Sequence, residues 1–287
     1  MSANIFSINA PCSFGSNGTS TKDVMLMLLL VGIAVLLITL EKLWPAGELP
    51  KVKGWWARVA CLNLAQLGVV IFAGQTWEVW LKKWSLLHIS SVLPPFLAAF
   101  VAYLLSCFVF YWWHRFRHES NFFWRLCHQM HHSPRRIEVL TSFYKHPVEI
   151  TIDSFLTSSL IYPLLGCDVN AAAIYMVLIT AAEYFYHWNV HTPHWLGWFI
   201  QRPESHRVHH QRNRHSMNYA DLPVLDWLFG TLKNPAKRVP NCGFDAIREA
   251  RFGEILAFRD VHKTAPSPIC FGCSRRWRCQ AAKEGAK

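Results

Sequence analysis

The sequence predicts an all-α fold, an integral-membrane helical bundle of about four transmembrane segments with a cytoplasmic helical cap. Long runs without charge are the first observation, because a spanning helix needs about 20 mostly apolar residues. Composition is the second: 52% of the residues are hydrophobic and 16% are charged, against about 25% charged in soluble domains. The third is a group of histidines that begins where the last long apolar run ends.

Three apolar runs have the length expected of membrane segments. They are Val24–Leu40, Val59–Trp77 and Trp84–Trp113, and the first two contain 17 and 19 uncharged residues. In the third run, Pro94-Pro95 marks the expected start of the helix, because proline suits the first helical position. The abundant tryptophan and phenylalanine, 14 and 19 residues, fit the same conclusion, because aromatic rings favour the membrane interface.

Two shorter apolar runs follow later in the chain. Ser154–Cys167 and Val169–Ala182 have 14 residues each and are interrupted by Gly166 and Asp168. Each is too short to cross a bilayer alone, so we predict a broken or re-entrant helical hairpin.

Basic residues indicate the orientation. The net charge is +11, and the Lys and Arg residues are concentrated after Trp113 and in the loop that follows the first segment. By the positive-inside tendency, both regions are expected in the cytoplasm. We therefore expect a multi-pass protein whose active site faces the cytoplasm, in the cell inner membrane of a bacterium or the endoplasmic reticulum of a eukaryote. No nucleic-acid-binding motif accompanies the positive charge, and the sequence does not indicate an oligomeric state.

Composition divides the chain into three parts. Residues 1–22 are an N-terminal extramembrane segment without the features of a signal peptide. Residues 23–235 hold the membrane domain, and residues 236–287 form a polar tail that we expect to be flexible. The nine cysteines are scattered, which argues against a disulfide framework. Cys270, Cys273 and Cys279 in the tail offer a single C-x-x-C pair, whereas zinc sites of this kind use two.

Thirteen of the fifteen histidines fall between His114 and His215. Two boxes have the pattern H-x-x-x-H and two have H-x-x-H-H. Residues at i, i+3 and i+4 share one face of a helix, so each box presents its rings in one direction. The four boxes supply ten candidate metal ligands: His114, His118, His128, His131, His132, His187, His191, His206, His209 and His210.

The number of imidazoles predicts more than one metal ion. Ten are too many for one tetrahedral zinc, whereas two ions sharing about ten nitrogens, with room for a small ligand, account for them. Clustered histidines at ligand spacing are typical of a metal site. Imidazole binds Zn, Cu, Fe and Ni, so the ligand type alone does not identify the metal.

These boxes resemble those of the fatty acid hydroxylase / sterol desaturase superfamily, which comprises integral-membrane di-iron oxygenases. The resemblance covers about residues 105–235. It includes the sequence elements YKHPVE at 144–149, PESHRVHH at 203–210, NYAD at 218–221 and DWLFGT at 226–231.

The resemblance implies that the histidines of the four boxes are the ligands. His191 is the least secure of them, because some relatives keep only the first histidine of that box, and His194 competes for its place. His146 is implied as either a ligand or a partner of one. The second ring nitrogens of the ligands need orienting partners, and the candidates are Glu183, Asn189, Asp221 and Asp226.

The resemblance also implies the reaction and its partners. It predicts two Fe ions in a di-iron centre, O2 as co-substrate, and hydroxylation or desaturation of a lipid with a fatty acyl or sterol-like structure. Electrons are expected from NAD(P)H through a separate reductase with a b-type cytochrome or ferredoxin, because the chain has no G-x-G-x-x-G nucleotide loop.

Two alternatives remain open. A histidine-rich membrane zinc enzyme would need a base, and no H-E-x-x-H motif supplies one. A metal transporter would place its ligands near the midplane of the membrane, whereas the segments before Trp113 contain only His88. Separately, the pattern of Pro223–Phe229 is compatible with a short helix lying on the bilayer.

Overall fold

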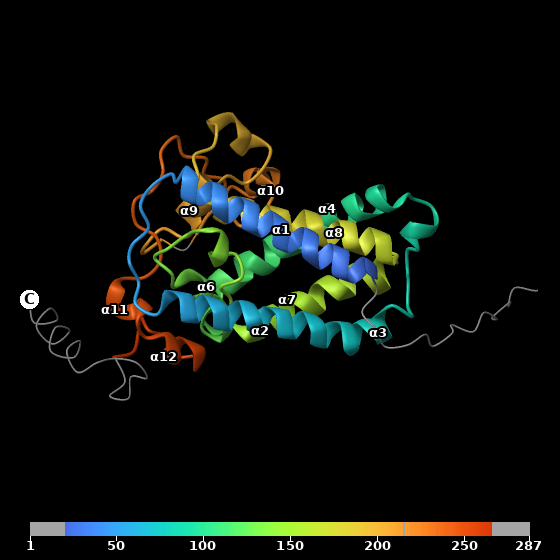
Figure 1. Cartoon of the computed structure of the whole chain (residues 1–287), viewed down its shortest axis with the longest axis horizontal. Coiled ribbons are helices and arrows are strands. Elements are labelled where there is room, and N and C mark those ends of the chain that lie inside the picture. Colours follow the sequence, from blue (N-terminus) through green and yellow to red (C-terminus); the bar gives the residue numbers. More distant parts are fainter. Residues whose placement is uncertain (1–20, 215, 266–287) are drawn as a thin grey trace, which may run out of the picture.

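The computed structural model describes residues 21–214 and 216–265, and within that part every regular element is a helix. The longest are α1 (Thr21–Leu43), α2 (Trp55–Gln75), α4 (Pro95–Glu119) and α8 (Val169–His187). These four run lengthwise through the molecule, and the shorter α6, α9, α11 and α12 gather at one end of it (Figure 1). The predicted all-α class is therefore confirmed.

The shorter elements connect and cap the bundle. They are α3 (Trp77–Leu81), η1 (Ile89–Ser91), α5 (Asn121–Phe123), η2 (Trp124–His128), α6 (Gln129–His132), η3 (Val139–Thr141), α7 (Pro147–Ser159), η4 (Leu160–Leu164), η5 (His194–Trp198), α9 (Pro203–His209), α10 (Pro223–Leu228), α11 (Ala246–Glu249) and α12 (Phe252–Leu256).

Three helical stretches in the described residues are long and apolar enough to cross a membrane: Trp55–Leu81, Pro95–Glu119 and Val169–His187. The chain is thus a multi-pass membrane protein. As predicted, Pro95 opens α4 at its first position, where the missing N–H costs no hydrogen bond. The fourth long helix, α1, has 23 residues and packs against α8.

The predicted hairpin is present, but its second half is longer than expected. Helix α7 continues into the π-helix η4, which contains Pro163, and the chain turns at Gly166, whose φ is 70°. The side chain of Asp168 then caps α8 by accepting a hydrogen bond from the Ala171 N–H at 2.8 Å. Helix α8 runs 19 residues to His187 and has the length of a span. The expectation that each half is too short to cross alone is therefore wrong for α8, which continues past Glu183 to His187. The Glu183 carboxylate is paired with Lys145 at 2.7 Å, so its charge is balanced.

Small side chains bring α4 and α8 together. Ala98, Ala99 and Ala102 of α4 are fully buried in one cluster with Ala171 and Tyr175 of α8. Small residues allow helix backbones to approach closely in a membrane, where van der Waals packing replaces the hydrophobic effect. This contact fixes the two helices whose ends carry His114, His118 and His187.

The described part of the segment after residue 236 contains two short helices. Residues 241–265 form α11 and α12 and pack against α6, with Phe244, Ile255 and Val261 buried beside Met130. The Gln129 side chain donates to the Arg259 carbonyl at 2.9 Å and accepts from the Val261 N–H at 3.0 Å. The polar composition of this segment concealed these apolar residues. The cysteines at 270, 273 and 279 lie outside the described residues, and Cys61, Cys107, Cys127, Cys167 and Cys242 are free thiols.

Candidate metal centre

Nine of the ten predicted histidines converge in two groups. The first consists of His114, His118, His128, His132 and His209, and the second of His131, His187, His206 and His210. Within each group, one ring nitrogen per residue lies within 4.8 Å of every other. Nitrogens bound to one ion at about 2.1 Å can be no more than about 4.2 Å apart. Only a small adjustment would therefore let either group close around a metal.

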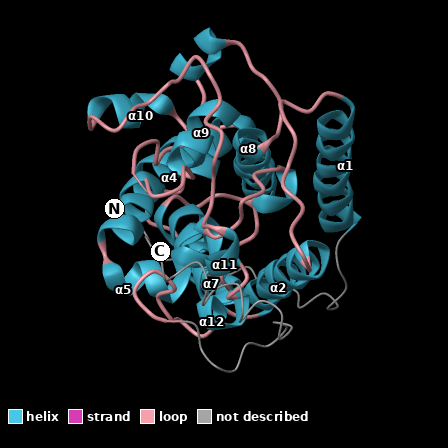
Figure 2. Ribbon diagram, turned by 90° about the vertical axis from the view of Figure 1, so that its left-hand side faces the viewer, coloured by secondary structure: helices cyan, strands magenta, loops and turns pink. Residues whose placement is uncertain are grey.

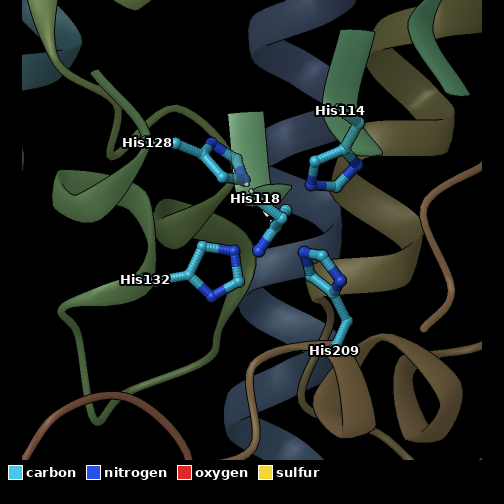
Figure 3. A group of neighbouring side chains, drawn as sticks. All are labelled: His114, His118, His128, His132 and His209. Carbon is cyan, nitrogen blue, oxygen red and sulfur yellow. Dashed lines mark hydrogen bonds between the residues drawn. The ribbon is translucent and has the colours of Figure 1, made fainter. Parts of the chain in front are cut away.

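Local helix geometry aims these rings at a common space. His114 and His118 are one turn apart at the end of α4, and the five rings of the first group surround a single space (Figure 3). A π-turn, Trp124–His128, immediately precedes α6, and π-turns are frequent at functional sites. The third contributor is α9, where Pro203 starts the helix that carries His206 and His209.

The tenth predicted ligand, His191, lies apart from both groups. Its side chain is 70% exposed, and its Nδ1 is 3.8 Å from the Glu204 carboxylate. Helix α8 ends at His187, and Trp188 is already extended with ψ of 137°. The i, i+4 argument fails here because the helix does not continue as far as His191. His194 is also exposed, and its Nε2 lies 3.1 Å from the Asn234 carbonyl oxygen.

Close nitrogen pairs occur in both groups. The Nε2 atoms of His118 and His128 are 2.9 Å apart, and His206 Nε2 lies 3.1 Å from the Nε2 atoms of both His187 and His210. Two nitrogens at right angles on one ion, each about 2.1 Å from it, would be about 3 Å apart. These contacts have the spacing of ligands that share a metal.

The opposite edge of four of the nine rings is fixed by an oxygen. Nδ1 of His114 donates to the Tyr219 carbonyl at 2.8 Å, and Nδ1 of His209 donates to the Met217 carbonyl at 2.8 Å. Nδ1 of His187 donates to the Glu183 carbonyl at 2.9 Å. A proton on Nδ1 leaves the Nε2 lone pair available, which is the common arrangement of metal-binding histidine.

His128 has a charged partner instead. Its Nδ1 lies 2.9 Å from Oε1 of Glu149, which is fully buried and also paired with Arg117. Arg117 is 3.5 Å from Asp153, and Asp153 accepts a hydrogen bond from the Trp113 indole at 2.7 Å. A carboxylate that accepts a hydrogen bond from a ligand histidine raises the basicity of that ring. His128 of the first group should therefore donate its lone pair to a metal more strongly than a ring of the second group that is fixed by a backbone carbonyl.

The buried ring nitrogens Nε2 of His114 and Nδ1 of His131 have no hydrogen-bond partner among the described residues. Most buried polar atoms in native proteins are paired, so orphaned nitrogens of this kind suggest an absent ligand. A metal ion would satisfy them, and the residues present therefore fit a metal centre.

Burial keeps the rings neutral. Desolvation by burial, reinforced by the other histidines nearby, holds the pKa of His128, His131, His132 and His206 well below the usual value for histidine. A neutral imidazole retains the lone pair that a metal requires. The cluster is thus ready to bind metal at neutral pH without first losing protons.

Two other predicted residues, Asp226 and Asp221, hold segments that contact the histidine rings. Asp226 accepts from the N–H groups of Tyr219 and Ala220 at 2.8 and 3.0 Å, and so shapes the loop whose carbonyl holds His114. The Asp221 carbonyl accepts from the Gln201 N–H at 3.0 Å, and the Gln201 amide meets His206 Nδ1 at 2.8 Å. Burial raises the pKa of the Asp221 carboxyl to about 7.

Asn189 and His146 have structural contacts. The Asn189 amide donates to the Gly47 carbonyl at 3.0 Å, tying the end of α8 to the segment after α1. His146 caps α7 by accepting from the Val148 N–H at 3.1 Å. Neither belongs to a histidine group. Sequence reasoning did not identify Met217 or Tyr219 as partners of the ligands, because a backbone carbonyl leaves no trace in the residue type. It also missed Gln201, whose side-chain amide contacts His206.

Known proteins share the part of the chain that carries the two histidine groups. A family model described as fatty acid hydroxylase matches residues 99–231, a range that contains all nine grouped histidines. Human alkylglycerol monooxygenase is 31% identical over 148 residues, covering 48% of this chain and 31% of that protein. Methylsterol monooxygenase 2-2 of Arabidopsis thaliana is 34% identical over 137 residues, covering 46% of this chain and 50% of that protein.

A further relative is named as a decarbonylase and not as a monooxygenase. Very-long-chain aldehyde decarbonylase GL1-11 of Oryza sativa is 33% identical over 138 residues, covering 46% of this chain and 51% of that protein. The chain thus spans no more than about half the length of these relatives. No solved structure matches it.

Proposed function

The chain belongs to the fatty acid hydroxylase superfamily, and from this premise we propose that it is a membrane-bound di-iron oxygenase that oxidises a lipid. The nine grouped histidines would hold two irons. O2 would be the co-substrate, and the outcome would be hydroxylation or desaturation of a fatty acyl or sterol-like substrate.

One observation carries the proposal: the two histidine groups adjoin. The rings of His132 and His210, one from each group, are stacked with centroids 4.4 Å apart. The rings of His206 and His209 are also stacked, at 5.2 Å. Two metal ions in these groups would be neighbours in one buried space, as an oxygen-activating pair requires and as two independent structural zinc sites do not.

The chemistry divides between metal and protein. When bound, two irons supply the redox chemistry that breaking an unactivated C–H bond requires and that side chains cannot provide. This chain's residues hold and orient the ligands and exclude water. His128, His132, His209 and His210 are at most 1% exposed, so competing reactions with solvent are suppressed.

A narrow cavity of about 20 Å³ lies beside the first group. It is lined by Tyr103, Cys107 and Tyr111 of α4, by Ile179 of α8, and by Tyr219 and Asp221. The Tyr219 ring packs against His114 and His209, with centroids 5.6 and 5.7 Å away. Such a volume holds about one water molecule, so a lipid chain approaching the metals by this route must displace the cavity wall.

Electrons must come from another protein. We propose the route that the family resemblance implies, from NAD(P)H through a reductase and a b-type cytochrome or ferredoxin. Helices α6 and α9 carry histidines of both groups and lie with α12 at one end of the bundle (Figure 1). The positive charge after Trp113 supports placing this end in the cytoplasm.

Metal analysis combined with oxygen uptake tests the proposal. The protein, purified in lipid nanodiscs, is expected to contain two irons per chain and to consume O2 only when reduced and supplied with lipid. Mass spectrometry of the lipids should show a gain of one oxygen atom or a loss of two hydrogen atoms. A preparation that holds zinc and takes up no oxygen after iron loading would contradict the proposal and favour a zinc protein.

Lipidomics would identify the substrate. A host expressing the protein is compared with one expressing a histidine-box variant, and the oxidised lipid should be present only in the first. Net movement of metal across the membrane, without any lipid product, would instead favour a transporter.

A further inference from the structure

Large apolar side chains are exposed on two short elements beside the bundle. On η5 and directly after it, Trp195, Trp198 and Phe199 are 62%, 57% and 68% exposed, and on α10, Trp227 and Leu228 are 65% and 60% exposed. The two elements contact each other. Neither is long enough to span a membrane. We call this surface the aromatic flank. Exposed patches of this kind mark a surface that something else covers.

The aromatic flank carries almost no charge. Residues 192–200 contain no acidic or basic residue apart from His194, and residues 222–232 contain only Asp226. Asp226 is fully buried, because its carboxylate accepts the Tyr219 and Ala220 N–H groups. The outward face therefore carries no full charge, in a cap that is otherwise rich in arginine. Surfaces that face water normally carry interspersed charged side chains, and the aromatic flank lacks them.

The aromatic flank is continuous with the lipid-facing side of α4. Exposed apolar residues recur every fourth position along this spanning helix: Phe96, Phe100, Leu104, Phe108, Trp112 and Phe116. This spacing forms one stripe along a helix. At its end, the Trp112 ring meets the Phe229 ring, directly after α10, with centroids 4.8 Å apart. The stripe that faces lipid thus runs into α10 without interruption.

The depth of this junction matches the boundary of a bilayer. Helix α4 rises about 1.5 Å per residue, so the distance from Pro95 to Trp112 is about 26 Å. The hydrocarbon core of a membrane is about 30 Å thick. With Pro95 at one edge, Trp112 and α10 lie near the other edge. Tryptophan prefers this position, because its ring is apolar and its N–H is polar. In the view along the bundle, α10 extends sideways from α4 (Figure 2).

We propose that the aromatic flank lies in the membrane interface as a non-spanning anchor, with its exposed side chains among the lipids. The occupant of this surface is the bilayer and not a protein. The inference rests on the spanning helices and not on the proposed oxidation. It also sets the depth of the metal centre, because Asp226 of α10 holds the loop that carries Tyr219, and the Tyr219 carbonyl holds His114.

Site-specific photocrosslinking tests this placement. A benzophenone amino acid replaces Trp198 or Trp227 in the full chain, and the protein is reconstituted in phosphatidylcholine nanodiscs. Both positions are more than half exposed, so the probe needs no displaced neighbour. After irradiation, mass spectrometry of the intact protein should show adducts of phosphatidylcholine mass at both positions.

The matched control is the same probe at Ile247. This side chain is 36% exposed on α11, which lies at the left-hand end of the described molecule in Figure 1, beyond the start of α2, where Arg58 donates to the Glu249 carbonyl at 3.0 Å. We expect at least fivefold less lipid adduct there. Equal yields of lipid adduct at all three positions would overturn the proposal. It would also be overturned if the probes at 198 and 227 reacted only with protein, or did not react. Failure of the oxygen-uptake experiment would leave this result unaffected.

Discussion

At the scale of single residues, the metal centre depends on which nitrogen of each ring is directed at the neighbouring histidines. His114, His187 and His209 have Nδ1 bound to main-chain oxygens, and His128 has it bound to Glu149. Each ring is thereby held with Nε2 directed at its neighbours. Removing a ligand should therefore remove metal without unfolding the bundle, because the bundle is formed by α4 and α8.

Substitution of His209 by alanine should abolish lipid oxidation and reduce bound metal, while membrane insertion is retained. The matched control is His191→Ala, which removes a histidine that belongs to the same sequence pattern but lies outside both groups. We expect that variant to keep its metal and activity within about twofold. Metal content and turnover of the two purified proteins decide the matter. Equal losses in both would place His191 among the ligands.

Glu149 should act through His128 and not by contact with substrate. Glu149→Ala is expected to weaken metal binding by about 10–100-fold, as loss of such a partner commonly does. Glu149→Gln, which keeps an acceptor but loses the charge, should have a smaller effect. Chelator titration measures the affinity, and the unfolding temperature shows whether loss of the buried pair with Arg117 also destabilises the fold.

The control for Glu149→Ala is Glu119→Gln. Glu119 is an exposed carboxylate that pairs with Arg115, and both residues lie at the end of α4. Exposed ion pairs contribute little, so neither affinity nor stability should change. An unchanged chelator titration for Glu149→Ala would show that the contact with His128 has no role in holding metal.

Acidification should destabilise the metal-free protein. The pKa values of His128, His131, His132 and His206 are lowered by burial. The unfolded chain, whose histidines have a pKa of about 6.5, therefore binds more protons than the folded one below that pH. Stability is fully present above about pH 6.5 and falls as the pH decreases. Unfolding temperatures at pH 8, 7, 6 and 5 check this, and a flat profile would contradict it.

At the scale of elements, the hairpin of α7 and α8 depends on its turn. Gly166 has φ of 70°, and a Cβ there would lie 2.0 Å from Ser85 Oγ and 3.0 Å from the His88 Cα. Gly166→Ala should therefore destabilise the protein by about 1–3 kcal/mol. Gly68→Ala in α2 is the control, because nothing lies within 4 Å of its Cβ position. Thermal unfolding of both variants should separate them, and identical midpoints would show that the turn adapts.

Sequence reasoning predicted most of this architecture because hydrophobic length and helical spacing are local properties. The boxes at His128 and His206 lie on real helices, so their rings converge. The box at His187 and His191 does not, because α8 ends between them. The packing of the segment after residue 236 could not be predicted, because Phe244, Ile255 and Val261 are isolated in a polar segment and only the fold shows that they meet Met130.

At the scale of the whole molecule, the segment after residue 235 supports the metal centre from outside the membrane. Gln129, the neighbour of His128, is held by main-chain groups of Arg259 and Val261. Removal of residues 268–287 should leave metal content and activity unchanged, whereas removal of 236–287 should abolish both. Metal analysis of the two truncated proteins is the measurement. Loss of metal in the shorter deletion would implicate the cysteines at 270, 273 and 279.

The loop at Met217–Tyr219 has a consequence for mutagenesis. Met217 and Asn218 both adopt positive φ, 72° and 53°, and the peptide oxygens of Met217 and Tyr219 hold His209 and His114. An amino-acid substitution changes the side chain and leaves the peptide oxygen in place. Replacement of the Met217 side chain would therefore not reveal its role, although its carbonyl oxygen orients the His209 ring. Only a shift in loop length, or an ester in place of the amide, would expose that dependence.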